Sequence, residues 1–466
     1  MDLLNQSIES DSCKDENLIH FSHAPNYTEF HNSCLLPNRP CILPPDLIAN
    51  WPVAQSRAWA LITSPSSSAE SSGIKALINW NALKAQYGSH TAPVVITRTD
   101  LSSPGKLCEE RIEMTIADAV DLIHRYQHGK EPTVHSVYIK DWHLIKQLCP
   151  TSTQPYTVPE IFADDWMNNT PPPPSDSPCS ASCTKEGKDD IVDDFRFVYA
   201  GTQGSRTLLH RDVYTSYSWS SNVVGCKRWY LFPPRVISHL RRFPKIDTSE
   251  LVLDIQTLSS LISTSNENSD AGACRKRKEY PGLELAWSAV QIIDQKQGET
   301  IFIPSNWYHQ VENLTECISI NRNWCNSVNL PSLYHSIVAE LDHVQESLCD
   351  VKEMLQNGCS SSSTTASKGK QGEQVEGWEK EFYTLVQDVA IKDAGWAWDA
   401  FWNMVHWNLT KPATRSETRL RPGDAWIRDR LLPLVVEFDA RKDARWLDPQ
   451  IRHTALKCKT LLEAMG

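Results

Sequence analysis

The chain has 466 residues, of which 40% are hydrophobic, and it carries a formal net charge of -11. This content suffices for a large core, whereas the acidic balance argues against stable binding to nucleic acid, which needs clustered lysine and arginine. The first residues form no basic or apolar leader, no apolar run of about eighteen residues occurs, and the 14 cysteines are scattered. We therefore expect the thiols to be reduced and no segment to span a membrane. We expect the protein in the cytoplasm, with a nuclear location as the alternative.

The N-terminal third predicts a mixed α/β region. Residues 1–25 are polar and lack periodicity, which is typical of disorder. Residues 26–168 are predicted to form the N-terminal flanking α/β region of the strand-rich unit that follows them. Two β-branched runs, at 93–98 and 134–142, predict strands, and helical spacing of apolar residues from Met114 to Tyr126 predicts a helix between them.

The pattern at 193–328 is dominated by short strands. Alternating or continuous apolar runs, bounded by glycine or proline, occur at 195–199, 228–232, 300–303 and 317–320. Strands of this length without regular intervening helices indicate an antiparallel double sheet or jelly roll. Residues 169–192, rich in proline and serine, predict an inserted loop before this core. A polar insertion at 256–280 contains four consecutive basic residues at 275–278, which could be a nuclear address but in a polar loop are more often only solvated.

The remainder of the chain predicts helices. Apolar residues spaced by three and four follow Pro331 and predict one long helix at 329–357. Residues 358–375 are of low complexity and predict a linker, and aromatic stripes within 376–466 predict a helical region with a packed core. The helices could dimerise or cover the barrel, so the oligomeric state is open.

The candidate metal ligands are one His-x-Asp sequence and a distant histidine. His210 and Asp212 stand two apart, so on an extended strand both side chains would leave the same face. His309 follows a strand and a turn that end in Pro304 and Trp307, and it would supply a second imidazole. Two histidines and one carboxylate leave one side of an octahedral metal open, which suits non-haem Fe(II) that activates dioxygen beside a chelating co-substrate.

Lys227 is unexpected at the start of the apolar run that ends at Phe232. A buried ammonium group without a partner is costly, and a carboxylate of a bound co-substrate would supply the partner. The alternative interpretation is that Lys227 lies at the end of the strand and extends its ammonium into water.

Several separated stretches resemble, in order, the JmjC-domain (cupin-type) 2-oxoglutarate oxygenases. The resemblance runs from about Phe30 to Trp324 and is carried by residues 138–144, 194–199, 217–220, 227–234 and 319–324. It implies an α+β fold: a double-stranded β-helix (the jelly roll of the JmjC cupin barrel) with flanking N-terminal elements and a C-terminal helical region.

The resemblance also implies a role for individual residues. A catalytic triad would hold Fe(II), 2-oxoglutarate would be the co-substrate, and O2 would be the oxidant. Ser220 falls where related enzymes often have an asparagine, so it is open whether Ser220 or another residue completes the 2-oxoglutarate site. The implied iron ligands are His210, Asp212 and His309, and the implied 2-oxoglutarate residues are Tyr138, Thr207, Lys227 and Asn323.

The function implied by the resemblance is that of an Fe(II)- and 2-oxoglutarate-dependent dioxygenase that hydroxylates protein. Its protein partner would be the eukaryotic translation termination release factor, hydroxylated on a lysine carbon. One alternative is a JmjC histone lysine demethylase, which would release the methyl group as formaldehyde. Another is a cupin-like binding module without catalysis, which would not convert 2-oxoglutarate to succinate.

Overall fold

A computed structural model describes residues 17–56, 58–63, 75–103, 106–149, 151–168, 195–246, 249–255, 279–361, 371–394, 396–411 and 417–465. The predicted loop at 169–192 lies outside these residues, as does most of the insertion predicted at 256–280. The chain forms two compact units. The barrel unit comprises Met1–Ile161, Arg196–Asp212 and Tyr217–Asn323, and the helical unit comprises Phe162–Phe195, Val213–Ser216 and Trp324–Gly466.

Two facing groups of antiparallel strands form the predicted double-stranded β-helix. One is a four-stranded sheet in the order β12-β11-β14-β9, and the other is the β13-β10-β15-β8 part of a nine-stranded sheet. Consecutive strands mostly alternate between the two sheets, as a jelly roll requires. The strands are β8 (Arg196–Gly201), β9 (Arg206–His210), β10 (Tyr217–Val224), β11 (Lys227–Phe232), β12 (Gln291–Gln295), β13 (Thr300–Ile303), β14 (Tyr308–Asn313) and β15 (Cys317–Trp324).

Apolar side chains of both sheets fill the barrel. The buried cluster is built from alternate positions of β11 and β13, from one residue each of β2, β12 and β14, and from the residue just before β14; its members are Ile42, Trp229, Leu231, Ile293, Ile301, Ile303, Trp307 and Val311. The indole N–H of Trp229 donates to the Gln295 side chain at 2.8 Å. The Gln295 amide in turn donates to the backbone carbonyl of Ser220 on the opposite sheet at 2.8 Å. The polar atoms of this core are thereby satisfied, which avoids the cost of burying them alone.

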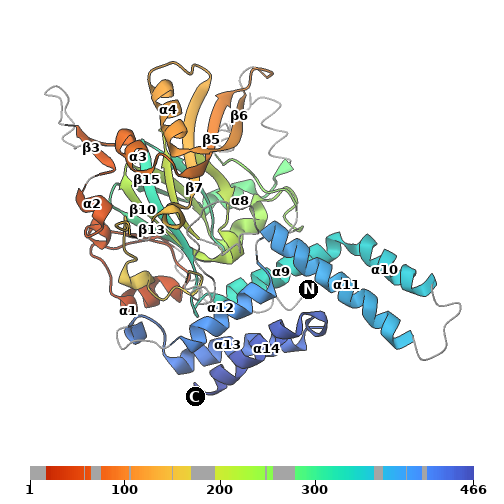
Figure 1. The fold of residues 1–466 in the computed structure, drawn as a ribbon. Helices are drawn as coiled ribbons and strands as arrows, with labels where there is room; N and C mark the ends of the chain where they lie inside the picture. Colours follow the sequence, from red (N-terminus) through yellow and green to blue (C-terminus); the bar gives the residue numbers. More distant parts are fainter. Residues whose placement is uncertain are drawn as a thin grey trace. The chain divides into compact units, whose positions relative to one another are not determined.

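N-terminal strands widen the nine-stranded sheet on both sides of the barrel. On one side lie β7 (Val134–Trp142), β5 (Thr91–Thr99) and β6 (Leu107–Thr115), and on the other lie β2 (Cys41–Leu43) and β1 (Ile19–His20). Helix α4 (Ile116–Gln127) contacts β5, β6 and β7 (Figure 1). Its buried stripe recurs at helical spacing, which explains why one face packs on the sheet.

Shorter elements complete this unit. They are the helices α1 (Tyr27–Phe30), η1 (His31–Leu35), η2 (Pro45–Ile48), α2 (Pro52–Ser56), α3 (Trp80–Tyr87), α5 (Leu144–Gln147), η5 (Pro234–Leu240) and α8 (Leu283–Ser288), and the strands β3 (Ala60–Thr63) and β4 (Lys75–Ile78), which form a separate two-stranded sheet.

The structure corrects three of the predicted boundaries. The N-terminal stretch predicted as disordered to residue 25 contains strand β1, which pairs in parallel with β2. The predicted helix at Met114 begins at Ile116, because Thr115 caps it by accepting from the amide of Asp118 at 3.1 Å. Strand β9 ends at His210, so Asp212 lies beyond the strand.

Strand β6 was not predicted, and its position explains why. It forms the outer edge of the nine-stranded sheet, and most of its residues are exposed, including Glu109, Glu110 and Arg111. Charged residues on an edge strand oppose pairing with another chain. The same charges hide the apolar alternation by which a strand is normally predicted.

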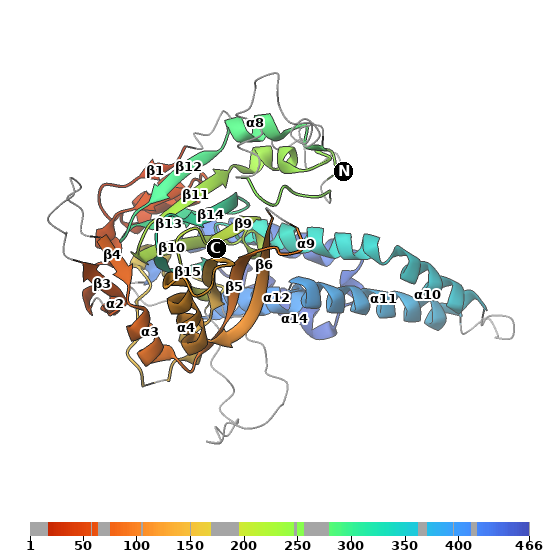
Figure 2. The ribbon, with the colours of Figure 1, turned by 90° about the horizontal axis from the view of Figure 1, so that it is seen from above.

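The helical unit contains α9 (Leu330–Ser347), α10 (Cys349–Ser361), α11 (Gln371–Ala394), α12 (Trp398–Thr410), α13 (Asp424–Ala440) and α14 (Pro449–Glu463), with the short turns η3 (Glu160–Phe162), η4 (Val213–Thr215), η7 (Glu417–Arg419) and η8 (Ala444–Trp446) at its margins and between its helices. The single helix predicted at 329–357 is divided at Leu348, where φ is -102° and ψ is 21°. Helices α10 and α11 lie side by side (Figure 2). Of the helices in the described ranges, none has both the length and the apolar character needed to cross a bilayer.

The core of the helical unit is aromatic. Tyr334 of α9, Trp398 and Trp402 of α12 and Phe438 of α13 are buried. The ring centroids of Trp398 and Phe438, and those of Trp402 and Phe438, are 5.0 Å apart. These distances lie in the range of favourable ring pairs. The aromatic stripes therefore form packing, as the sequence predicts.

The tight turn between β10 and β11 contains a glycine and sets the position at which β11 starts with Lys227. Gly225 has a φ of +83°, and a side chain there would overlap the carbonyl oxygen of Glu316. The turn is held on the β14–β15 turn, since the amide of Cys226 donates to Thr315 Oγ1 at 3.0 Å. Only glycine combines this backbone conformation with this close approach.

We expect Gly225→Ala to lower the free energy of unfolding by at least about 2 kcal/mol, because it adds both backbone strain and a clash with backbone. Gly204→Ala is the matched control. Its φ of +79° is similar, but nothing lies within 4 Å of the added carbon, so it should cost only about 1 kcal/mol. Urea unfolding followed by fluorescence measures both values, and equal losses would contradict the role of the contact with Glu316.

Candidate metal centre and its pocket

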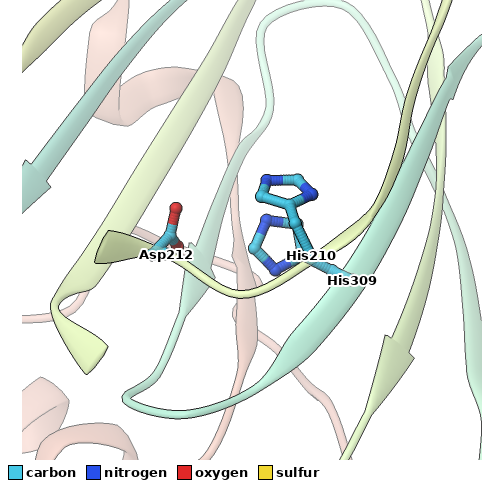
Figure 3. A group of neighbouring side chains, drawn as sticks. All are labelled: His210, Asp212 and His309. Atoms are coloured by element: carbon cyan, nitrogen blue, oxygen red, sulfur yellow. The ribbon is translucent and has the colours of Figure 1, made fainter. Parts of the chain in front are cut away.

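The structure brings His210, Asp212 and His309 together (Figure 3). The two histidines are directly opposite each other on the neighbouring strands β9 and β14. Asp212 follows two residues after His210, in the segment that leaves β9. One ligand atom of each residue lies within 4.8 Å of the others, which allows a single ion to contact all three.

Backbone contacts select the tautomer of both histidines. The Nδ1 atom of His210 lies 2.8 Å from the carbonyl oxygen of Leu208, and that of His309 lies 3.2 Å from the carbonyl oxygen of Trp307. A carbonyl oxygen can only accept, so in each ring Nδ1–H is the donor. Each Nε2 atom is therefore left with a lone pair, which is what a metal ligand requires.

The electrostatic surroundings keep His210 neutral. Burial, together with the neighbouring His309, lowers the pKa of His210 to about 4, although Asp212 opposes this shift. A neutral imidazole binds a metal ion without first losing a proton. The site is thus prepared for a cation at neutral pH.

Asp212 is oriented from the opposite sheet. The hydroxyl of Ser218 on β10 donates to Asp212 Oδ2 at 2.6 Å. Hydrogen bonds to a liganding carboxylate hold its direction and support metal affinity. Ser218 therefore fixes one carboxylate oxygen and leaves the other available for a metal.

All the site residues that were predicted from the sequence line one pocket. Its lining contains the three candidate ligands, the four candidate 2-oxoglutarate residues, Ser220 and further residues of both sheets: Tyr138, Tyr199, Thr207, His210, Asp212, Ser218, Ser220, Lys227, Trp229, His309, Val311, Asn321 and Asn323. A mixture of convergent polar groups and apolar walls is typical of a small-molecule site.

Lys227 reaches across the interior of the barrel. It begins on β11 in the four-stranded sheet, is 2% exposed, and its ammonium donates to Ser319 Oγ on β15 at 2.6 Å. The ring centroid of Tyr199 lies 5.7 Å from the ammonium nitrogen. Within the described ranges Lys227 forms no ion pair, and burial lowers the pKa of this side chain. The position therefore contradicts the alternative in which the ammonium reaches water.

These observations fit a divalent metal with an anionic co-substrate. Two neutral imidazoles and one carboxylate form the donor set of non-haem iron sites. A buried ammonium that contacts a hydroxyl and an aromatic ring, and has no ion-pair partner in the described part of the chain, retains its attraction for a carboxylate. Both features occur in the same pocket, so the residues present suit iron and a dicarboxylate such as 2-oxoglutarate.

Sequence reasoning missed Tyr199, Ser218 and Asn321, which also line the pocket. Ser319, Asn321 and Asn323 alternate on β15 and so share one face. Once Asn323 is placed in the pocket, this alternation would have indicated Asn321. No comparable signal distinguishes Ser218 from the other serines of β10.

Known proteins are similar to this chain over most of its length. The family of the cupin-like domain matches residues 27–329. The 2-oxoglutarate and iron-dependent oxygenase JMJD4 of Mus musculus is 30% identical over 347 residues, or 72% of this chain and 67% of that protein. The arginine-specific demethylase JMJ20 of Arabidopsis thaliana is 34% identical over 255 residues, or 53% of this chain and 47% of that protein.

The JmjC domain-containing protein 1 of Schizosaccharomyces pombe is 29% identical over 329 residues. The alignment covers 70% of this chain and 56% of that protein. The chain thus spans about two thirds of the mouse relative and about half of the two others.

Removing the hydroxyl that holds Asp212 should weaken metal binding. We expect Ser218→Ala to lower the affinity for Mn²⁺ about 10-fold, because the carboxylate loses its fixed direction. Ser221→Ala is the control, since Ser221 lies on the same strand but bonds to Thr300. Calorimetric titration with Mn²⁺ measures both affinities, and equal affinities of the two variants would contradict this role.

The lowered pKa of His210 predicts how the stability of the metal-free protein depends on pH. The folded state binds its proton near pH 4 and the unfolded state near pH 6.5, so between these values the unfolded state holds more protons. Stability from this group is present above about pH 6.5 and is lost as the pH falls toward 4, by at most about 1.4 kcal/mol per pH unit. The free energy of unfolding of the wild type, measured in urea, should fall relative to that of His210→Gln as the pH is lowered through this window. A constant difference between the two proteins would argue against the shift.

Proposed function

The chain belongs to the cupin-like family and, within it, to the 2-oxoglutarate and iron-dependent oxygenases, and we propose that it hydroxylates a carbon atom of a protein side chain. The observation that carries this proposal is the convergence of His210, Asp212 and His309 beside the buried ammonium of Lys227. Iron would be held by the first three residues. Its co-substrate would be held by Lys227.

When bound, iron and 2-oxoglutarate supply the oxidising chemistry: O2 is consumed, 2-oxoglutarate becomes succinate and carbon dioxide, and one oxygen atom enters a C–H bond of the substrate. The protein residues position the reactants. His210 and His309 present Nε2 lone pairs because their Nδ1 atoms donate to backbone carbonyls. Ser218 holds Asp212 in the direction of the metal.

Lys227 would determine the direction of the co-substrate. Its ammonium can donate to the distal carboxylate of 2-oxoglutarate, a charge-assisted bond worth about 1.5–3 kcal/mol. The hydroxyls of Tyr138 and Thr207 line the same pocket and would donate to the same carboxylate. Asn323 would lie near the metal-binding end. Trp229 and Val311 contribute apolar wall, which keeps water away from the reacting groups.

The finer proposal is that the substrate is a lysine of the eukaryotic translation termination release factor. It rests on the resemblance of the motifs around Lys227 and Asn323 to the JmjC oxygenases. The net charge of -11 supports a basic segment as substrate, since opposite charges steer association. Such a partner would place the activity in the cytoplasm.

The similarity to JMJ20 favours demethylation as a second candidate. Hydroxylation of a methyl group on nitrogen would give an unstable product that releases formaldehyde. The same pocket residues would serve both reactions. The two reactions would differ in the substrate group that lies at the metal: an N-methyl group in demethylation, or a carbon of the side chain itself in hydroxylation. Analysis of the products therefore separates them.

The decisive experiment incubates the recombinant release factor with the protein, Fe²⁺ and 2-oxoglutarate, and measures intact and fragment masses. We expect the mass of one oxygen atom on a lysine-containing fragment, and no change with His210→Ala, which lacks a ligand. Formaldehyde release from methylated peptides would instead support demethylation. Failure of the folded protein to form succinate with either class of substrate would contradict an oxygenase role.

A second prediction concerns Lys227. Replacing it with methionine keeps the length but removes the charge, and should raise the KM for 2-oxoglutarate about 10- to 100-fold. Arg228→Met is the matched control on the same strand, because Arg228 is exposed and pairs with Asp294 at 2.7 Å. Steady-state assays of succinate formation measure both, and an unchanged KM in the lysine variant would remove Lys227 from the co-substrate site.

A further inference from the structure

A chain of hydrogen bonds continues from Lys227 into strand β15. Lys227 Nζ donates to Ser319 Oγ at 2.6 Å, and Ser319 Oγ donates to Asn321 Oδ1 at 2.9 Å. The hydroxyl of Ser220 on β10 donates to the same Asn321 oxygen at 3.0 Å. Three strands of the barrel, β10, β11 and β15, are thus linked by one chain of hydrogen bonds.

The chemistry of the donors fixes the direction of this chain. An ammonium group only donates, so it occupies a lone pair of the Ser319 hydroxyl. The single proton of that hydroxyl must then point elsewhere, and an amide oxygen only accepts. If the Asn321 amide were rotated by half a turn, its NH₂ group would face both serine hydroxyls. Ser319 would then accept from two sides, and its own proton would lose its partner.

Two contacts within the protein fix the orientation of the Lys227 ammonium and so the direction of its remaining N–H bonds. One N–H is taken by Ser319, and the ring of Tyr199 covers a second side at 5.7 Å. The side chain has four flexible bonds and begins on the opposite sheet, so a fixed acceptor at its end limits the positions it can adopt. The rest of the ammonium is left for a ligand in the pocket.

We propose that Asn321 is a positioning residue that orients the Lys227 ammonium through Ser319. This inference rests on the proposed function, since the anion that Lys227 receives would be the carboxylate of 2-oxoglutarate. Asn321 acts at a distance: its amide oxygen holds the Ser319 proton, and this turns the Ser319 lone pair toward Lys227. Residues coupled through one such chain lose their effect together.

A double-mutant cycle tests the relay without turnover. The full-length protein is loaded with Mn²⁺ in the absence of Fe²⁺, and 2-oxoglutarate is titrated calorimetrically into the wild type, Asn321→Ala, Ser319→Ala and the double variant. We expect each single variant to raise the Kd for 2-oxoglutarate about 3- to 10-fold. The double variant should be no weaker than Ser319→Ala alone, because both substitutions interrupt one path.

The affinity for Mn²⁺ in the absence of 2-oxoglutarate should stay unchanged in all variants, since the relay contacts none of His210, Asp212 and His309. A general loosening of the pocket would lower it. If Asn321→Ala unfolds at a much lower temperature than the wild type, Asn321→Leu, which keeps the volume and loses the acceptor, takes its place in the cycle.

The outcomes separate this inference from the proposed function. If the wild type with Mn²⁺ fails to bind 2-oxoglutarate, the proposed function fails. If the wild type binds but the two single effects multiply in the double variant, Asn321 contacts the ligand independently and the relay is wrong. A Kd that is unchanged by Asn321→Ala also overturns the relay, whatever the effect of Ser319→Ala.

Discussion

The pocket depends on one charged side chain, that of Lys227, which crosses the interior of the barrel. Lys227 begins on one sheet, and its ammonium ends against a hydroxyl of the other. A carboxylate from the protein would have satisfied this charge and closed the pocket to anions. The chain offers a hydroxyl and an aromatic ring, which hold the ammonium without neutralising it. Without an anion beside it, the ammonium would carry an electrostatic cost that an anionic ligand removes, so ligand binding should stabilise the folded state.

The three candidate metal ligands follow the opposite principle, because contacts within the protein already orient them. Backbone carbonyls hold the tautomers of His210 and His309, and Ser218 holds Asp212. The two carbonyl oxygens belong to the backbone, whereas the third contact depends on the side chain of Ser218. Little reorganisation is then needed when a cation binds. The oriented ligands, together with an ammonium that has no ion-pair partner among the described residues, make the pocket receptive to a cation and an anion at once.

Much of the site could be predicted because its residues are unusual where they stand. A histidine two before an aspartate, and a lysine at the start of an apolar strand, need an explanation that ordinary packing does not provide. Asn321 and Tyr199 escape this reasoning, since polar and aromatic residues are common on half-buried strands and their face is known only once the strands are paired. Strands such as β7 and β13 agree with their apolar patterns to the residue. Strand β6 and the break at Leu348 do not, because charges mask the first and neither glycine nor proline marks the second.

The pairing of β9 with β14 has a consequence for how such a protein can vary. His210 and His309 face each other because of ladder register, which depends on the two strands alone and not on the length of chain between them. Segments inserted between β11 and β12 can therefore grow, shrink or change composition while the two imidazoles keep their spacing. The position of the candidate metal centre is thereby separated from the length and sequence of the connections.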